Sequence, residues 1–308
     1  WAEARPALKA ASWSLAMVLV TQVGGIVQTA VASTAAVDRG SGEAVASVAA
    51  AAIAWLIFML PHSVVTVSIA TAYFTRMSEH HQSGEMEKFK VDLTTALRVI
   101  AMVSVIASVL LIVLSYPIAR VFASEYSSAV ALGNVIAAFV IGLLPFSFVY
   151  MMQRAFYALE NTRTPFVFTT IQIAIYIVGA IAISYTVEAQ WLVVALSLLT
   201  STTVTIQAII AYTMLTKKVG SLGDHKVATA LAQFVLAGVI AGLIGYGAIE
   251  IIGGIKPGSF AVASVFSSSL TIAGVGFVMF GIYAIALRLL RVSEIDTALA
   301  GFKGILRR

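Results

Sequence analysis

Polar side chains interrupt the first long apolar stretch of this sequence at a helical spacing. Gln22, Thr29 and Ser33 are separated by seven and four residues, so a helix would place them on one face, and Gln28 is expected beside that face. Such groups are costly in lipid unless they meet a cavity or a partner. The pattern therefore predicts either the wall of a hydrophilic cavity or hydrogen bonds between helices, and both alternatives stay open.

A second polar group marks the end of the fourth apolar stretch. Gln153 and Arg154 are adjacent there, and Arg163 follows in the turn to the next stretch. A guanidinium has forked donors that suit phosphate or carboxylate oxygens, but an arginine at this depth can also anchor a helix to lipid phosphates. Six residues are thus candidates for substrate binding: Gln22, Gln28, Ser33, Gln153, Arg154 and Arg163.

The residue types that enzymes need are not arranged for catalysis. The histidines are His62, His80, His81 and His225, and the one cluster, Glu79-His80-His81, lacks a full set of metal ligands. The sequence has no cysteine, which excludes disulfides and thiolate sites. No nucleophile elbow or phosphate-binding loop is present. We therefore expect no enzymatic activity, no cofactor and no metal centre.

Eight apolar stretches must position the polar side chains. They cover roughly residues 10–33, 45–74, 93–114, 129–152, 166–185, 191–215, 227–249 and 260–287. Each is long enough, at about 20 residues, to cross a hydrocarbon core as a helix. Hydrophobic residues make up 60% of the chain, charged residues 11%, and the mean hydropathy is +0.99. We predict an all-α, polytopic membrane helix bundle with eight transmembrane helices.

The basic residues are distributed unevenly between the connections. The connections between the apolar stretches are numbered here from the N-terminus. Of the 19 lysines and arginines, 16 lie near the two termini or in the even-numbered connections, and the exceptions are Arg39, Arg120 and Lys256. The positive-inside rule then places both termini in the cytoplasm. The net charge of +5 follows from this asymmetry, so the basic balance indicates contact with anionic membrane lipids and not with nucleic acid.

Two polar segments have the pattern of amphipathic helices. In the connection over residues 75–92, Met86, Phe89 and Leu93 lie at helical spacing, which predicts a short helix on the cytoplasmic interface, with a solvated loop as the alternative. The same pattern, with Ile295 and Leu299 on one face, predicts a basic interfacial helix over 291–308, or else a linker to a cytoplasmic domain. The odd-numbered connections have the length of short turns.

The glycine content changes near residue 218 and suggests a boundary. We predict a six-helix unit over 1–218, a two-helix appendix over 219–290, and the terminal helix over 291–308. Gly238 and Gly242 form a small-xxx-small pattern that permits close helix packing. Pro61 and Pro145 are expected to bend the second and fourth spans.

Several motifs follow one another in a familiar order. The run Arg154-Ala-Phe-Tyr-Ala-Leu-Glu-Asn-Thr-Arg-Thr-Pro165 closes the fourth stretch. It is preceded by Gln28-Thr-Ala-Val-Ala-Ser33, Leu60-Pro61, Val67-Ser-Ile-Ala-Thr71, Arg76-Met-Ser78, Leu97-Arg98, Pro117-Ile-Ala-Arg120 and Gly142-Leu-Leu-Pro145. Together these motifs resemble the MurJ/MviN lipid II flippases of the multidrug/oligosaccharidyl-lipid/polysaccharide exporter superfamily.

The resemblance implies a fold and a function. Members of the family have two six-helix lobes that rock about a central cavity, and two further helices that form a groove for a lipid tail. This chain resembles the second lobe with the two further helices, so the implied partners are lipid II, membrane lipids and an N-terminal lobe of the same protein. The implied activity is transfer of lipid II across the bacterial inner (plasma) membrane by alternating access, with cytoplasmic regulatory proteins as further allowed partners.

The sequence also departs from the family pattern. Ala54-Trp55-Leu56-Ile57 stands where the family commonly has Ala-Asp-Arg-Leu, Gln28 replaces an acid, and Tyr176 takes the place of a frequent Asn. These departures argue against a charge-based substrate or cation site in this lobe. The alanine- and valine-rich spans resemble actinobacterial members, for which a cytoplasmic pseudokinase region beyond the C-terminus is also allowed.

Two other functions remain as hypotheses. The chain could be a non-transporting membrane scaffold that recruits cell-wall synthesis or regulatory proteins through its termini. It could also belong to a drug or polysaccharide exporter of the same superfamily. The sequence beginning at Trp1 is expected of a piece of a longer protein, and a preceding lobe with membrane arginines would favour the flippase.

Overall fold

The computed structural model describes residues 4–35 and 46–292, and this part of the chain is helical with no strand. The all-α prediction is confirmed. The elements are α1 (Ala4–Thr34), α2 (Val48–Pro61), the π-helix η2 (His62–Thr66), α3 (Val67–Gln82), α4 (Met86–Val113), α5 (Ser115–Phe122), α6 (Tyr126–Val140), α7 (Leu143–Ala158), α8 (Arg163–Thr186), α9 (Ala189–Val219), α10 (Asp224–Ile251) and α11 (Val265–Leu289).

The helices include the predicted membrane spans. Seven helical segments of the described chain are long and apolar enough to cross a membrane, with α2, η2 and α3 forming one of them. The two shorter helices α6 and α7, which meet at an angle of 41°, are together long and apolar enough to form an eighth span. The chain is therefore a multi-pass membrane protein, and the expected bend of the fourth span lies at Gly142, three residues before Pro145.

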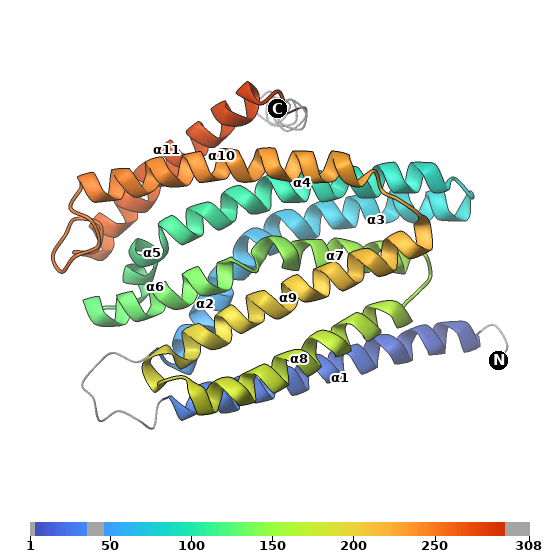
Figure 1. The fold of residues 1–308 in the computed structure, drawn as a ribbon, viewed down its shortest axis with the longest axis horizontal. Helices are drawn as coiled ribbons and strands as arrows, with labels where there is room; N and C mark the ends of the chain where they lie inside the picture. Colours follow the sequence, from blue (N-terminus) through green and yellow to red (C-terminus); the bar gives the residue numbers. More distant parts are fainter. Residues whose placement is uncertain (1–3, 36–45, 293–308) are drawn as a thin grey trace.

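The connections gather at two opposite ends of the bundle (Figure 1). The α3–α4, α7–α8 and α9–α10 connections lie at one end, which we call the basic end because it carries Arg76, Arg154 and Lys217. The opposite end carries α5 and the α8–α9 and α10–α11 connections, with Arg120 and Lys256. This arrangement matches the charge asymmetry on which the predicted orientation depends.

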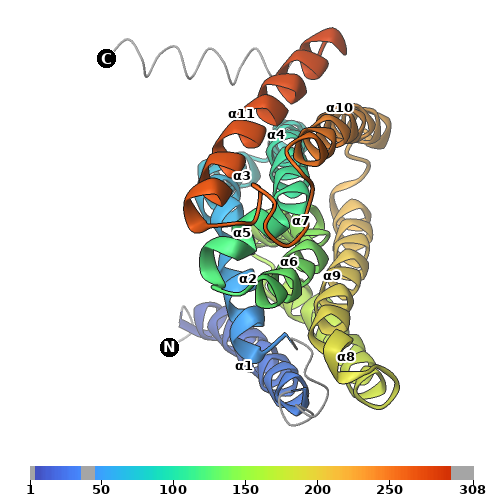
Figure 2. The same ribbon diagram turned by 90° about the vertical axis from the view of Figure 1, so that its left-hand side faces the viewer.

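The cross-section of the bundle is elongated. Figure 2 shows α1 and α8 on one side and α10 and α11 on the other, with α4 between α10 and the rest of the bundle. A β-carbon at Gly238 would meet Val105 of α4 at 2.9 Å, and one at Gly242 would meet Val109 at the same distance. The small-xxx-small pattern therefore lets α10 pack closely on α4.

The structure corrects the predicted connections. Residues 75–92 form neither an interfacial helix nor a solvated loop, since α3 continues to Gln82 and α4 begins at Met86. Phe89 and Leu93 are completely buried between these helices, so their apolar spacing reflects a helical hairpin and not a membrane surface. The connection after α4 is also more than a short turn, because it contains α5. The predicted helix over 291–308 lies outside the described residues, except for Arg291 and Val292.

Candidate functional site

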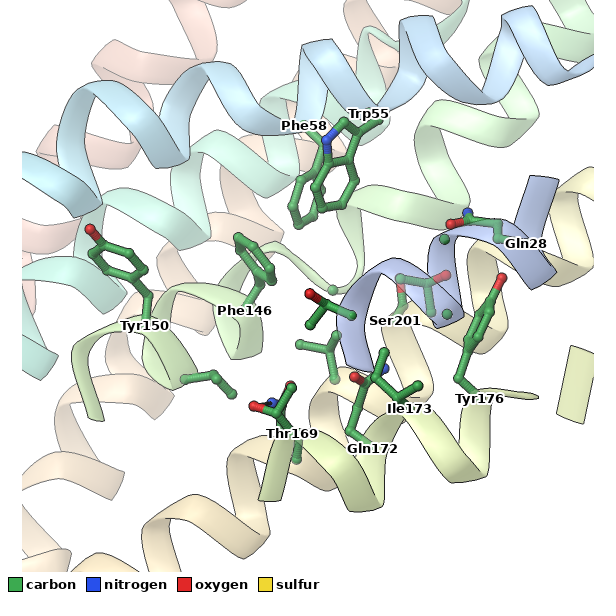
Figure 3. A pocket seen from close by; sticks show the side chains of 18 of the residues that line it. Gln28, Trp55, Phe58, Phe146, Tyr150, Thr169, Gln172, Ile173, Tyr176 and Ser201 are labelled. Atoms are coloured by element: carbon green, nitrogen blue, oxygen red, sulfur yellow. Dashed lines mark hydrogen bonds between the residues drawn. The ribbon is translucent and has the colours of Figure 1, made fainter. Parts of the chain in front are cut away.

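A pocket of about 440 Å³ lies between the spanning helices α1, α2, α7, α8 and α9 (Figure 3). Rings from α2 and α7 form one wall, and hydroxyl and amide side chains of α8 and α9 form much of the other. Its principal polar and aromatic residues are Thr21, Gln28, Trp55, Phe58, Phe139, Phe146, Tyr150, Gln153, Thr169, Gln172, Tyr176, Thr200, Ser201 and Gln207. Among the described residues that line it, none carries a charge.

The break between α6 and α7 shapes the floor of this pocket. Gly142 begins the bend, and a β-carbon there would lie 2.9 Å from the Cα atom of Ser201. The Ser201 hydroxyl lies 2.8 Å from the Ala138 carbonyl and 3.1 Å from the Phe139 carbonyl. A helix break exposes carbonyl groups that lipid cannot satisfy. The glycine thus allows α9 to come close enough for its serine to donate to these carbonyls.

Two amide–hydroxyl pairs join α8 to α9 in the wall of the pocket. Gln172 donates to the Thr203 hydroxyl at 3.0 Å, and Gln207 donates to the Thr169 hydroxyl at 3.1 Å. All four side chains are buried. Hydrogen bonds of this kind stabilise contacts between membrane helices, so these glutamines both hold the wall together and give it polar character.

Only part of α1 faces the pocket. Thr21 and Gln28 line it, and a β-carbon at Gly24, which lies between them, would be 2.8 Å from the Ile173 side chain of α8. Gln22 and Gln28 are six residues apart, which is about 120° around a helix with 3.6 residues per turn. Gln28 nevertheless lies beside Thr29 of the predicted polar face, because the two residues line a smaller neighbouring pocket together.

Gln22 and Ser33 are exposed on another side of α1 and do not line the pocket. The Ser33 hydroxyl donates to the Ala30 carbonyl of its own helix at 2.7 Å. Both residues stay predictions as substrate contacts, since their exposed side of α1 could meet lipid or another part of a larger protein.

Gln153 and Arg154 lie where the pocket approaches the basic end. Gln153 lines the pocket directly. Arg154 donates to the Tyr150 hydroxyl at 2.6 Å, and its guanidinium carbon lies 4.9 Å from the centre of the Tyr150 ring. Because Tyr150 lines the pocket, Arg154 reaches the site through this ring. Arg163 is separate from the pocket, and its guanidinium lies 5.8 Å from the Trp13 ring.

Sequence reasoning missed the aromatic wall and the hydroxyls of α8 and α9. Phe58 lies 5.2 Å from Trp55 in a stacked arrangement and 5.3 Å from Phe146 in an edge contact. Rings and hydroxyls are common in any membrane helix, so their positions become informative only when helices distant in sequence come together. The available signals were Trp55 and Tyr176, which both depart from the family pattern and both line the pocket.

A lipid II flippase MurJ family model matches residues 2–266 of the chain. The chain belongs to this family. The lipid II flippase MurJ of Thermosipho africanus (strain TCF52B) is 29% identical over 119 residues, which are 37% of this chain and 24% of that protein. A probable lipid II flippase MurJ of Rhizobium tropici is 29% identical over 143 residues, or 44% of this chain and 27% of the relative.

A solved structure confirms the fold. The structure of a lipid II flippase MurJ in an inward closed conformation matches 89% of this chain, with a TM-score of 0.66 and 22% sequence identity. The match covers 52% of the solved chain, so this chain spans about half the length of that protein.

Proposed function

We propose that this chain forms one side of the translocation path of a lipid II flippase that works by alternating access in the bacterial inner membrane. The supporting observation is an uncharged pocket within the spanning helices of a MurJ-family chain, with amide and hydroxyl groups set among apolar side chains. A transporter must shelter hydrophilic groups from lipid. The pocket offers hydroxyl and amide partners for sugar and peptide groups, without the charge that would hold a diphosphate too firmly to release.

The diphosphate has a candidate partner at the basic end. Arg154 is half-buried and bound to Tyr150 at the edge of the pocket. A guanidinium can bind phosphate oxygens in a forked geometry while it stays over the ring. In this proposal Arg154 meets the diphosphate as it enters from the cytoplasmic side, and the path is completed by protein beyond this chain.

The lipid tail has a candidate groove of its own. A hollow of about 530 Å³ lies between α4, α5 and α11, and its walls are Leu110, Leu111, Leu114, Ile118, Ile272, Gly276, Phe277 and Phe280. Phe277 and Phe280 are exposed, as expected of side chains that face lipid. An acyl or prenyl chain could lie here with no polar group to displace. Of the predicted appendix over 219–290, α11 lines this groove and α10 does not, so we propose that the tail lies between α11 and the α4–α5 segment.

Two glutamine substitutions provide the test of the pocket. Gln28→Leu should lower flipping strongly, because it removes an amide from the pocket, whereas Gln82→Leu, at an exposed position at the end of α3, should not. Both variants are made in the full-length protein and expressed in cells depleted of their own flippase, and lipid II in the outer leaflet is labelled. Equal flipping in the two variants would count against the pocket. No flipping by the full-length protein itself would favour the scaffold hypothesis.

The orientation of the chain is tested independently. The sequence has no cysteine, and Gly84 and Gly258 lie in connections where a β-carbon would have open space. Single cysteines at these positions should be labelled from opposite sides of the membrane, with Gly84→Cys on the cytoplasmic side. Labelling of both from outside the cell would overturn the proposed orientation.

A further inference from the structure

A buried histidine lies where the second span changes its helical register. Pro61 ends α2, and His62 begins the π-helix η2, where the Val67 amide donates to the His62 carbonyl. Single π-turns within helices are frequent at functional sites. Only 2% of the His62 surface is exposed, so an ionisable ring is enclosed within a membrane span at a local break in the backbone.

His62 belongs to a short chain of hydrogen bonds. Its Nδ1 atom lies 3.3 Å from the Ser147 hydroxyl of α7, and the Thr66 hydroxyl donates to Ser147 at 3.1 Å. Ser147 and Thr66 are buried as well. The chain is complete when Ser147, having accepted from Thr66, donates its own hydrogen to Nδ1. That arrangement requires a neutral imidazole.

The ring also contacts the wall of the pocket. The centre of the His62 ring lies 4.6 Å from that of Phe146 and 5.1 Å from that of Tyr150, both in edge-to-face geometry. Phe146 and Tyr150 line the pocket and belong to α7, which begins at the Gly142 break. A displacement of His62 would therefore move the aromatic wall and the bent span together.

The elements packed against η2 are α2, α3, α4 and α7. α2 has no ionisable side chain, and those of α7 are Tyr150, which contacts His62, and Arg154 and Tyr157 further along the helix. On α3 and α4, Asp92 pairs with Arg76 and His80, and Arg98 lies further along α4. The ionisable groups of these two helices are Tyr73, Arg76, Glu79, His80 and His81 on α3, and Glu87, Lys88, Lys90, Asp92 and Arg98 on α4.

In the described part of the chain, no carboxylate is in contact with His62. A proton on this ring would create a buried cation beside an aromatic wall and a hydroxyl, and an uncompensated buried charge is strongly unfavourable. The arrangement seen here therefore belongs to neutral His62. Protonation must favour an arrangement in which the contact between η2 and α7 opens toward water.

We propose that His62 is a proton-binding site that links pH to the opening of the pocket. The two helix breaks, at His62 and at Gly142, supply the bends through which the spans rearrange. The proposal rests on the proposed flippase function for its biological consequence, but the conformational change can be measured without substrate. A proton is the ligand, and Phe146 and Tyr150 transmit its binding to the pocket.

A cysteine reporter tests this coupling in the full-length protein in membrane vesicles. Gly25 lines the pocket and has open space for a side chain, so Gly25→Cys should be tolerated, and labelling by a water-soluble thiol reagent reports access. The ratio of labelling rates at pH 5.5 and pH 7.5 is compared between backgrounds, which cancels the titration of the thiol itself. Replacing His62 by Gln should change this ratio of labelling rates at least about fivefold, because fivefold is the lower end of typical coupling between two sites.

The controls separate this proposal from the flippase proposal. His81→Gln, at the basic end, should leave the labelling ratio unchanged. If His62→Gln is poorly expressed, His62→Asn is used in its place and should give the same result. An identical ratio with His62 and with either replacement would overturn the proton site, even if flipping is normal. A His62-dependent ratio in a protein that does not flip lipid II would instead sustain the proton site and refute the transport function.

Discussion

Two hollows in this bundle differ in the polar groups that line them. The pocket among α1, α2, α7, α8 and α9 is lined by amides, hydroxyls and rings, and it is bounded by a helix break. The groove among α4, α5 and α11 is lined by aliphatic and phenyl side chains, together with one glycine. A substrate with a hydrophilic head and a long apolar tail would need one surface of each kind. The proposed transport of an amphipathic lipid predicts two such surfaces.

The two hollows also differ in how the surrounding helices are held. Around the pocket, buried hydrogen bonds such as Gln172–Thr203 and Ser201–Ala138 connect α8, α9 and α6. Near the groove, contact is mainly apolar, with Leu114, Ile249 and Met279 in one buried cluster. Hydrogen bonds have directions, whereas apolar contacts do not. Small steric changes should therefore be costlier at the pocket than at the groove.

The largest effect is expected at the helix break under the pocket. Gly142→Ala places a methyl group 2.9 Å from a backbone atom of α9, so we expect a loss of about 1–3 kcal/mol of stability. Gly25→Ala, in the same pocket but with open space around it, should differ from wild type by at most about 1 kcal/mol. Thermal unfolding of the purified full-length protein in detergent measures both. Equal melting temperatures would show that the break is not fixed by this contact.

A smaller effect is expected in the groove. Gly276→Leu should fill part of the hollow, because a β-carbon there would point toward Leu114 at 3.6 Å. Folding should be retained, since the neighbours are flexible side chains, but flipping of long-tailed substrate should fall severalfold. Gly274→Leu is the matched control, because Gly274 lies on the same helix with open space and outside the groove lining. A similar loss in both variants would argue against tail binding in the groove.

The smallest effect is expected in the α3–α4 hairpin, away from both hollows. Hydrogen bonds from Lys88 and then from His80 lower the pKa of Glu85 below its ordinary 4.5. A lowered folded pKa stabilises the folded state above the ordinary value, and this contribution is lost as the pH falls through the folded pKa. Protection of hairpin amides from hydrogen exchange should thus decrease in acid.

Glu85→Gln should weaken that pH dependence, whereas Glu79→Gln, an exposed neighbour, should preserve it. Access to the pocket should not change in either variant. An equal loss of amide protection in acid in both variants and in the wild type would contradict this role for Glu85. The pH dependence of hairpin stability would then come from the other carboxylates of the hairpin. A change in pocket access would show that the basic end and the pocket are coupled.

The span pattern is predictable because it depends on local composition. Some 20 consecutive apolar residues must form a helix in lipid, and Gly238 and Gly242 indicate a close contact without identifying α4 as the partner. The prediction for residues 75–92 was wrong for a related reason. Phe89 and Leu93 have the same spacing whether they meet lipid or another helix, so periodicity alone could not distinguish the two.

The candidate site was only partly accessible to the same reasoning. Gln28 and Gln153 line the pocket, but Gln22 and Ser33 lie elsewhere on α1, and Arg163 lies against Trp13. Polar residues in a span indicate that some partner exists. They do not indicate which side of the helix that partner occupies, and Thr169 or Ser201 could not be distinguished from hydroxyls that merely bond their own backbone.

The sequence by itself determined the helical class, the spans, the charge asymmetry and the motifs that relate the chain to the flippases. Each of these is a property of neighbouring residues or of composition. The tertiary structure decided that Gly142 admits Ser201, that Tyr150 connects Arg154 to the pocket, and that His62 meets α7. Those contacts join helices far apart in the chain, and their geometry depends on how the spans cross, which no local pattern specifies.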